Sequence, residues 1–211
     1  MERVLCLLMG YVFGLFQTGY LYSRSKHMDI RNYGSGNSGS TNVLRVMGKK
    51  AGLIVFLGDA GKMIAACLIT RVLFRSQPEL LYVYLLYTGF GVILGHIFPF
   101  YMEFKGGKGI AASAGLLAST DWRVMLVCLV VFVAAVAITR YVSLGSILVM
   151  ICFFIGMVFF GARGDFGIGA AHLTEFYVLA GLISAMGIWR HHTNIKRLLS
   201  GTENKLGARK E

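Results

Sequence analysis

Long apolar stretches alternate with short polar segments along the whole chain. A helix that crosses a bilayer needs about 20 mostly apolar residues, whereas helices of soluble proteins average about 11–12 residues of any kind. The apolar stretches cover residues 4–22, 52–74, 79–100, 107–120, 122–139, 144–161 and 174–190. This pattern predicts an all-α integral membrane protein with seven transmembrane helices, which form a single domain over residues 1–211.

The stretch 107–120 is shorter than the others. As a helix it extends only about 21 Å, against a hydrocarbon core of about 30 Å, so it is either a short crossing helix or a re-entrant segment. A re-entrant segment would put the basic tail outside, although cytoplasmic loops normally carry the excess of Lys and Arg. We therefore expect seven crossings. The first stretch is expected to be a mature helix and not a signal peptide, because no small-x-small cleavage pattern closes it.

The distribution of Lys and Arg predicts the orientation. The loop after the second stretch holds little basic charge beyond Arg75, whereas the loop after the first stretch is rich in it, with Arg24, Lys26, Arg31, Arg45, Lys49 and Lys50. By the positive-inside rule the N-terminus is external and the C-terminus is cytoplasmic. The net charge of +11 follows largely from this topology and from attraction to anionic membrane lipid. No nucleic-acid partner is expected.

The four cysteines lie inside apolar stretches and are never spaced as Cys-x-x-Cys. They are Cys6, Cys67, Cys128 and Cys152. We interpret them as small packing residues, with neither a disulfide framework nor a metal site implied.

Residues 29–48 form a polar, glycine-rich segment on the expected cytoplasmic side. Its glycines allow positive φ and close backbone approach, and its short polar side chains can face one anion. These residues are Gly34, Ser35, Gly36, Asn37, Gly39, Ser40, Thr41 and Asn42. A helix capped by Ser40, Thr41 or Asn42 and running into Arg45 would aim free N–H groups at a phosphate. A flexible linker is the alternative, but the run is not repetitive.

A second segment, residues 95–109, ends in Gly106-Gly107-Lys108-Gly109 at the start of the short stretch. Backbone N–H groups and an ammonium group at a helix N-terminus can hold a phosphate. The spacing Gly-x-x-x-x-Gly-Lys-[Ser/Thr] of a Walker A loop is absent. His96, in the same segment, is either a base or a hydrogen-bonded histidine at the membrane interface.

The third polar region is split between residues 139–146, which contain Ser143, and residues 189–203. His191, Asn194 and Arg197 recur at i, i+3 and i+6, so they share one side of a helix. With Glu203 close behind, they can complete a polar pocket. Farther on, the basic tail has the composition of a solvated, lipid-attracted segment; its residues are Lys205, Arg209 and Lys210.

Asp59 and Lys62 lie three residues apart inside the second stretch. Charges are costly within a membrane, and pairing on one helix face lowers this cost. The sequence leaves open whether the two form a structural ion pair or contact a substrate.

Four motifs occur in order: Tyr-Gly-Ser-Gly-Asn-x-Gly-x-Thr-Asn-x-x-Arg-x-x-Gly, Gly-His-x-x-Pro-x-x-x-x-Phe-x-Gly-Gly-Lys-Gly, Thr-Arg-Tyr-Val-Ser and His-x-x-Asn-Ile-x-Arg-Leu-x-x-Gly-x-Glu. Together they resemble the PlsY family of acyl-phosphate:glycerol-3-phosphate acyltransferases. The one departure is near Lys62, where Ala60-Gly61-Lys62-Met63 stands in place of a larger apolar residue followed by Lys-Gly.

The resemblance implies a bacterial inner-membrane enzyme with its active site on the cytoplasmic face. It would use acyl phosphate and glycerol 3-phosphate, without a nucleotide or metal cofactor, to make 1-acylglycerol 3-phosphate in the first step of phospholipid synthesis. The implied catalytic residues are Ser35, Asn37, Lys108, His191 and Asn194. The implied substrate-binding residues are Gly36, Thr41, Asn42, Arg45, Gly106, Gly107, Gly109, Ser143, Arg197 and Glu203.

Acyl phosphate is an activated anhydride that a hydroxyl group can attack directly, so the expected work of the protein is positioning and charge stabilisation. Lys108 is expected to stabilise the departing phosphate, Ser35 and Asn37 the oxyanion, and Arg45 and Arg197 the acceptor's phosphate. Either His191 or the donor phosphate takes the hydroxyl proton.

Three other function classes compete with this hypothesis. A transporter of a phosphorylated anion would also need intramembrane charge and broken helices, but the motifs gather at one face and no internal repeat is visible. A phosphatidyltransferase would need a cluster of aspartates, which the sequence lacks. A structural scaffold would leave the polar loops without a purpose.

Overall fold

The computed structural model describes residues 1–207, and all regular secondary structure in that part is helical. The basic tail residues Arg209 and Lys210 lie outside it. The helices are α1 (Glu2–Gly14), α2 (Thr18–Arg24), α3 (Ser40–Met47), α4 (Lys49–Leu73), α5 (Pro78–Ile97), α6 (Ile110–Thr120), α7 (Trp122–Thr139), α8 (Val142–Ala162), α9 (Leu173–Trp189) and α10 (His192–Leu199), with short 3₁₀ turns at Ile30–Asn32, Phe100–Met102 and Ala170–His172.

Six helical stretches among the described residues are long and apolar enough to cross a membrane. They are Glu2–Arg24, Lys49–Leu73, Pro78–Met102, Trp122–Thr139, Val142–Ala162 and Ala170–Trp189. Their outer surfaces carry large exposed apolar side chains such as Ile138, which is 83% exposed. Large apolar side chains exposed on so many helices fit a lipid environment. The predicted all-α membrane protein is therefore confirmed.

Helix α6 corresponds to the short predicted stretch and is an apolar helix of only 11 residues. At about 1.5 Å per residue it extends about 16 Å, less than the hydrocarbon core. The seventh crossing and the orientation of the termini stay predictions.

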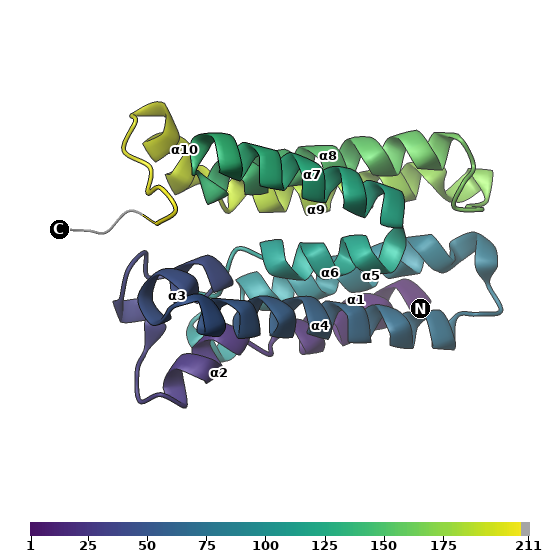
Figure 1. Ribbon diagram of the computed structural model, residues 1–211. Helices are drawn as coiled ribbons and strands as arrows, with labels where there is room; N and C mark the ends of the chain where they lie inside the picture. The colour runs from purple at the N-terminus through teal and green to yellow at the C-terminus, as the bar shows by residue number, and fades with distance from the viewer. Residues whose placement is uncertain (208–211) are drawn as a thin grey trace.

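The helices form two layers (Figure 1). Helices α7, α8, α9 and α10 lie in one layer, and α1 to α6 lie in the other. The largest buried core cluster joins the layers through α4, α5, α6, α8 and α9, with Leu116 of α6 and Phe176 of α9 fully buried. Helices α3 and α10 lie at the same end of the molecule, at the left in Figure 1. Polar segments that are distant in the sequence therefore meet at this end.

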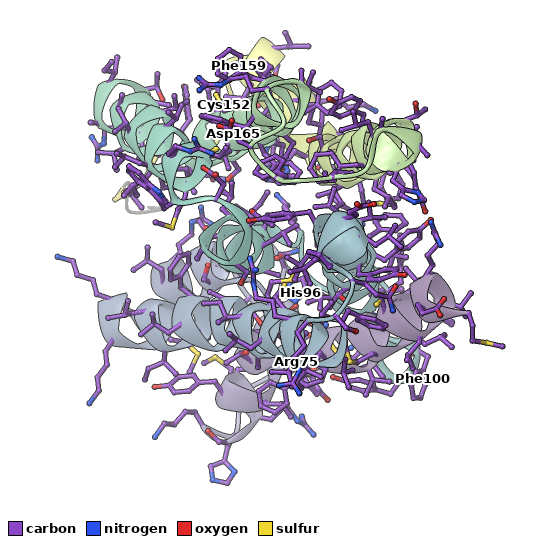
Figure 2. The ribbon with its side chains drawn as sticks, turned by 90° about the vertical axis from the view of Figure 1, so that its right-hand side faces the viewer. Arg75, His96, Phe100, Cys152, Phe159 and Asp165 are labelled. Atoms are coloured by element: carbon purple, nitrogen blue, oxygen red, sulfur yellow. The ribbon has the colours of Figure 1, made fainter. Side chains whose placement is uncertain are left out.

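Viewed end-on, the labelled side chains separate into inner and outer positions (Figure 2). His96 lies among the helices of the lower layer, whereas Phe100 and Phe159 lie toward the periphery. Their exposure agrees: His96 is buried, and both phenylalanines are more than half exposed.

Helices α1 and α5 pack closely because glycines face each other. An added Cβ at Gly14 would lie 2.8 Å from the Cα of Gly95, and one at Gly95 would lie 3.0 Å from the Cα of Gly14. Small residues allow such backbone contact between membrane helices. This contact brings the end of α1 beside His96.

The predicted helix over 4–22 is interrupted, which corrects the sequence analysis. Helix α1 ends at Gly14, and α2 begins at Thr18. The Gln17 side chain donates from Nε2 to the carbonyl oxygens of Gly14 at 3.1 Å and His96 at 3.0 Å. A break in a membrane helix is tolerated where protein groups satisfy the freed carbonyls.

At the opposite end, an ion pair ties α1 to α9. Arg3 donates from Nε and Nη2 to the carboxylate of Glu175 at 2.5 and 2.8 Å, and Tyr87 of α5 donates to the same carboxylate at 2.8 Å. This bidentate geometry is favourable, and it lies far from the polar loops.

Candidate active site

A cavity opens at the end where α3 and α10 lie. Its lining is Ser35, Asn37, Gly39, Ser40, Thr41, Asn42, Arg45, Phe56, Asp59, His96, Lys108, Gly109, Ile110, Ala111, Phe132, Val142, Ser143, Ser146, His191, Asn194, Arg197, Glu203 and Asn204. Polar groups therefore come from all three segments identified in the sequence, and apolar groups come from α4, α6, α7 and α8.

Residues 33–39 form a loop whose shape depends on Asn42. The Asn42 side chain accepts from the backbone N–H of Ser35 at 2.8 Å and donates to the carbonyl oxygens of Tyr33 and Asn37, each at 2.9 Å. Gly34, at φ +62°, takes a conformation that favours glycine. Asn42 thus orders the loop, and its assignment as a substrate ligand stays a prediction.

Helix α3 begins where the sequence suggested, but its cap differs. Gly39 is the N-cap residue and makes no side-chain hydrogen bond there, so the predicted capping by Ser40, Thr41 or Asn42 was wrong. The backbone of Gly39 instead accepts from the N–H of Asn42 at 3.0 Å. The first N–H groups of a helix have no partner within it. The residues that carry the first N–H groups of α3, Ser40 and Thr41, line the cavity.

Helix α6 provides a second N-terminus on the same cavity. Its N-cap is Gly109, at φ +83°, so the backbone turns sharply before Ile110. Gly109, Ile110 and Ala111 all line the cavity. Two helix N-termini facing one cavity favour a negatively charged ligand, because each carries partial positive charge and free N–H groups.

The glycine–lysine loop, residues 106–109, is fixed from behind by backbone hydrogen bonds. The N–H of Gly106 donates to Ile97 O at 3.0 Å, and the N–H of Gly107 donates to His96 O at 3.1 Å. Arg190, at the end of α9, donates from Nη2 to the carbonyl oxygen of Gly107 at 3.2 Å. The loop is therefore held between α5 and the end of α9, and its lysine projects into the cavity.

Lys108 is the most perturbed cation of the cavity. Its Nζ donates to the side-chain oxygen of Asn194. The pKa of Lys108 is lowered to about 8, mainly by burial and then by the neighbouring guanidinium of Arg197, while Glu203 acts in the opposite direction. The ammonium form is costly here, so an anionic ligand would be strongly favoured beside it.

Glu203 organises the other side of the cavity. Its carboxylate accepts from Arg197 Nε at 2.8 Å, Asn194 Nδ2 at 2.8 Å and Ser143 Oγ at 3.1 Å. Because Asn194 also holds Lys108, a continuous network runs from Arg197 to Lys108. Glu203 therefore orders three predicted site residues, and its own assignment to substrate binding stays a prediction.

His191 is buried at the start of α10. Its Nδ1 lies 2.7 Å from the carbonyl oxygen of Gly187, so Nδ1 carries the proton and Nε2 keeps a lone pair. The pKa of His191 is lowered to about 4, mainly by burial and then by the charge of Lys108, while the hydrogen bond to Gly187 acts in the opposite direction. The imidazole is therefore neutral near pH 7 and can accept a hydrogen bond.

Most of the residues predicted from the sequence meet in this cavity. Those in its lining are Ser35, Asn37, Thr41, Asn42, Arg45, Lys108, Gly109, Ser143, His191, Asn194, Arg197 and Glu203. Gly36, Gly106 and Gly107 do not line it; Gly106 and Gly107 lie behind the lysine and hold the loop to α5.

Some lining residues were absent from the predicted site. The sequence leaves the roles of Asp59 and His96 open, and both line the cavity. Arg190, which binds the glycine–lysine loop from behind, lies in the polar segment 189–203, but the sequence indicates no role for it. The apolar lining residues gave no signal, because any residue of a membrane helix is apolar; they include Phe56, Phe132 and Val142.

Comparison with known proteins identifies relatives of the whole chain. The family model described as "Glycerol-3-phosphate acyltransferase" matches residues 4–201. A glycerol-3-phosphate acyltransferase of Clostridioides difficile (strain 630) is 40% identical over 211 residues, covering 99% of this chain and 97% of the relative. A glycerol-3-phosphate acyltransferase of Thermoanaerobacter sp. (strain X514) is 36% identical over 213 residues, and the match covers 100% of this chain and 99% of the relative.

Two solved structures have the same fold. The crystal structure of PlsY (YgiH), an integral membrane glycerol 3-phosphate acyltransferase, in its glycerol 3-phosphate form superposes with a TM-score of 0.84 at 34% identity, covering 98% of this chain and 96% of that one. The lysophosphatidic acid form gives 0.81 at 33% identity, with the same coverage. The chain therefore belongs to the glycerol-3-phosphate acyltransferase (PlsY) family and is an integral membrane acyltransferase of phospholipid synthesis.

Proposed function

We propose that the protein transfers a fatty acyl group from acyl phosphate to the primary hydroxyl of glycerol 3-phosphate. The hydroxyl oxygen forms an ester bond with the acyl carbon, and the anhydride bond between that carbon and the phosphate oxygen breaks. The products are 1-acylglycerol 3-phosphate and inorganic phosphate. The observation that carries this proposal is one cavity in which two helix N-termini and the cations Arg45, Lys108 and Arg197 lie against an apolar wall.

The donor phosphate is assigned to the glycine–lysine loop. Lys108 is pre-positioned by Asn194, and the first N–H groups of α6 lie beside it. As the anhydride bond breaks, negative charge grows on the departing phosphate. Donors fixed in advance stabilise such charge without reorganisation. This assignment requires Lys108 to be protonated, which a bound phosphate favours.

The acceptor phosphate is assigned to Arg45 and Arg197, on α3 and α10. Each guanidinium can bind a phosphate through two N–H groups. Glu203 already holds Nε of Arg197, which leaves the outer nitrogens of that guanidinium for a ligand. Ser35 and Asn37 lie on the neighbouring loop, where their donors can serve the oxyanion of the acyl carbonyl.

The proton of the attacking hydroxyl is assigned to the donor phosphate. A base with a pKa of about 4, as for His191, drives proton removal poorly, because general bases work best when their pKa lies near the operating pH. Its free Nε2 can still accept the hydroxyl's hydrogen bond and orient the oxygen toward the acyl carbon. His191 thus positions the nucleophile, and the departing phosphate accepts the proton.

The acyl chain is assigned to the apolar side of the cavity, which Phe56, Ile110, Phe132 and Val142 supply. Contact of these side chains with a hydrocarbon chain removes apolar surface from water. The membrane orientation that fits best puts this cavity on the cytoplasmic face of a bacterial inner membrane, with seven crossings and the N-terminus outside. Transport of a phosphorylated anion is not carried further, because the relatives are named as acyltransferases.

The test is an assay of the purified, detergent-solubilised protein with labelled glycerol 3-phosphate. Palmitoyl phosphate, palmitoyl-CoA and palmitoyl carrier protein are offered separately. We expect lysophosphatidate only from palmitoyl phosphate, with an equal amount of inorganic phosphate released. Product formed from the thioesters instead would overturn the donor assignment. No product from any donor, in protein shown to be folded, would overturn the proposed reaction.

A further inference from the structure

Lys62 lies within α4 and is almost fully buried, with 7% of its surface exposed. Its ammonium group contacts three separate parts of the molecule. It lies 3.0 Å from Asp59 Oδ1 on its own helix, 2.9 Å from His96 Nδ1 on α5, and 2.5 Å from the carbonyl oxygen of Phe16 at the break after α1. Lys62 Nζ also lies 3.4 Å from the carbonyl oxygen of Gly14, so acceptors on four residues surround the ammonium group.

The Phe16 contact explains why a lysine is present at this depth. The carbonyls at the C-terminal end of a helix carry partial negative charge and lack partners within the helix. Lys62 neutralises this end, while Asp59 balances its charge and also accepts from Thr18 Oγ1 at 3.0 Å, in the first turn of α2. The buried charges therefore join α1, α2 and α4.

The contact with His96 extends this network to the active site. An ammonium group can only donate, so His96 Nδ1 accepts and its proton lies on Nε2. The imidazole lies directly against Gly107: a Cβ built there would lie 2.9 Å from Cε1 and 3.0 Å from Cδ2 of the ring. The carbonyl oxygen of the same histidine accepts from the N–H of Gly107 at 3.1 Å.

We propose that Lys62 is a positioning residue for acyl transfer: its ammonium group holds His96 against Gly107 and so fixes the glycine–lysine loop that carries Lys108. This inference rests on the proposed function of that loop. Lys62 itself is absent from the cavity lining, whereas Asp59 and His96 are part of it. Its effect on the reaction is therefore transmitted through His96.

A purely structural ion pair between Lys62 and Asp59 makes different predictions. Removing one partner of a buried ion pair leaves an uncompensated charge and strongly lowers the stability of the fold. Replacing both partners together often changes the stability little. A structural pair is thus dispensable as a unit. A positioning lysine is not, because the double replacement also removes the donor to His96.

The test compares Lys62→Met with Asp59→Asn/Lys62→Met in the full-length protein. Thermal stability, kcat, the KM for each substrate and hydrogen–deuterium exchange of the peptide containing Gly106 and Gly107 are measured. Arg3→Met/Glu175→Gln is the matched control, because it removes an ion pair at the opposite end of the helices. His96→Leu is a second test of the same contact. It removes the imidazole that accepts from Lys62, while Asp59 and Lys62 stay paired.

We expect the double variant to regain most of the thermal stability that Lys62→Met loses. Its loop amides should nevertheless exchange roughly tenfold faster, and its kcat should fall by roughly 10- to 100-fold, as misplacement by about 1 Å can do. The KM for glycerol 3-phosphate should stay within about twofold, because Arg45 and Arg197 are untouched. His96→Leu should reproduce the fall in kcat and the faster exchange.

Wild-type kcat and wild-type loop exchange in the double variant would overturn the inference and leave a structural ion pair. Equal acceleration of loop exchange in the Arg3/Glu175 control would overturn it as well, because the effect would then be general loosening. Hydrogen exchange needs no turnover. If the wild-type protein used no acyl phosphate, the proposed function would be wrong. The exchange data would still show whether Lys62 holds the glycine–lysine loop in place.

Discussion

Lys108 donates a hydrogen bond to the side-chain oxygen of Asn194, although 86 residues separate them. The lysine comes from the loop before α6 and the asparagine from α10, so the contact joins the two layers of helices across the cavity. The same asparagine donates to Glu203 at 2.8 Å. The ammonium group is thus oriented before substrate arrives, which is the condition under which a donor contributes most to catalysis.

Lys108→Ala is expected to lower kcat by about 10²-fold or more, as loss of one preorganised donor typically does. The measurement is turnover with palmitoyl phosphate and glycerol 3-phosphate in protein of unchanged thermal stability. Lys105→Ala is a matched control three residues earlier, because Lys105 is exposed and, within residues 1–207, forms an ion pair with the exposed Glu103 alone. Near-normal turnover of Lys108→Ala would rule out the leaving-group role.

The pH dependence of kcat/KM should report Lys108 on its alkaline side. Its pKa of about 8 means that the lysine is protonated below that pH and neutral above it. Since kcat/KM reports groups of the free enzyme, activity should fall as pH rises through about 8. Glu203→Gln should move this fall to lower pH, because the carboxylate raises the pKa of Lys108. If the alkaline fall in kcat/KM stayed at the same pH in this variant, it would report a group other than Lys108.

Hydropathy predicted the membrane helices well, because each long helix must be apolar over its whole length. It could not show the break after Gly14, where the neighbouring Gln17 side chain donates to Gly14 O and the distant Lys62 donates to Phe16 O. The boundary is set by tertiary contacts and leaves little trace in local composition.

The candidate site was predictable where its chemistry needs rare residue types. Glycines, serines and asparagines stand out between apolar stretches, and Lys108, His191 and Asn194 were found in this way. The difference between residues that line the cavity and those that hold a loop was not predictable. Gly107 belongs to the same motif as Lys108 but holds the loop from behind, and Asn42 lines the cavity while its side chain also shapes the backbone of the loop.

His191→Gln tests which group takes the proton. We expect a lower kcat with an unchanged shape of the pH–rate profile, because the imidazole, with its pKa held at about 4, orients the hydroxyl and does not carry the proton away. The measurement is kcat against pH for both proteins over the range in which they stay folded. Loss of an acid limb in the variant would instead identify His191 as the base.

Gly107→Ala tests the contact between the glycine–lysine loop and α5. The added Cβ would collide with the His96 ring, whose Cε1 and Cδ2 would lie 2.9 and 3.0 Å away. Because His96 is held by Lys62 on its other side, the ring cannot retreat and the loop must move. We expect kcat to fall by roughly 10- to 100-fold, measured with saturating palmitoyl phosphate.

Gly61→Ala is the matched control for this substitution. A Cβ at Gly61 meets no atom within 4 Å, and alanine favours a helix interior by about 1 kcal/mol over glycine. The control should therefore keep wild-type kcat and match or exceed wild-type thermal stability. If Gly107→Ala kept wild-type turnover as well, the loop would have room to accommodate a methyl group, and tight support of Lys108 by His96 would be excluded.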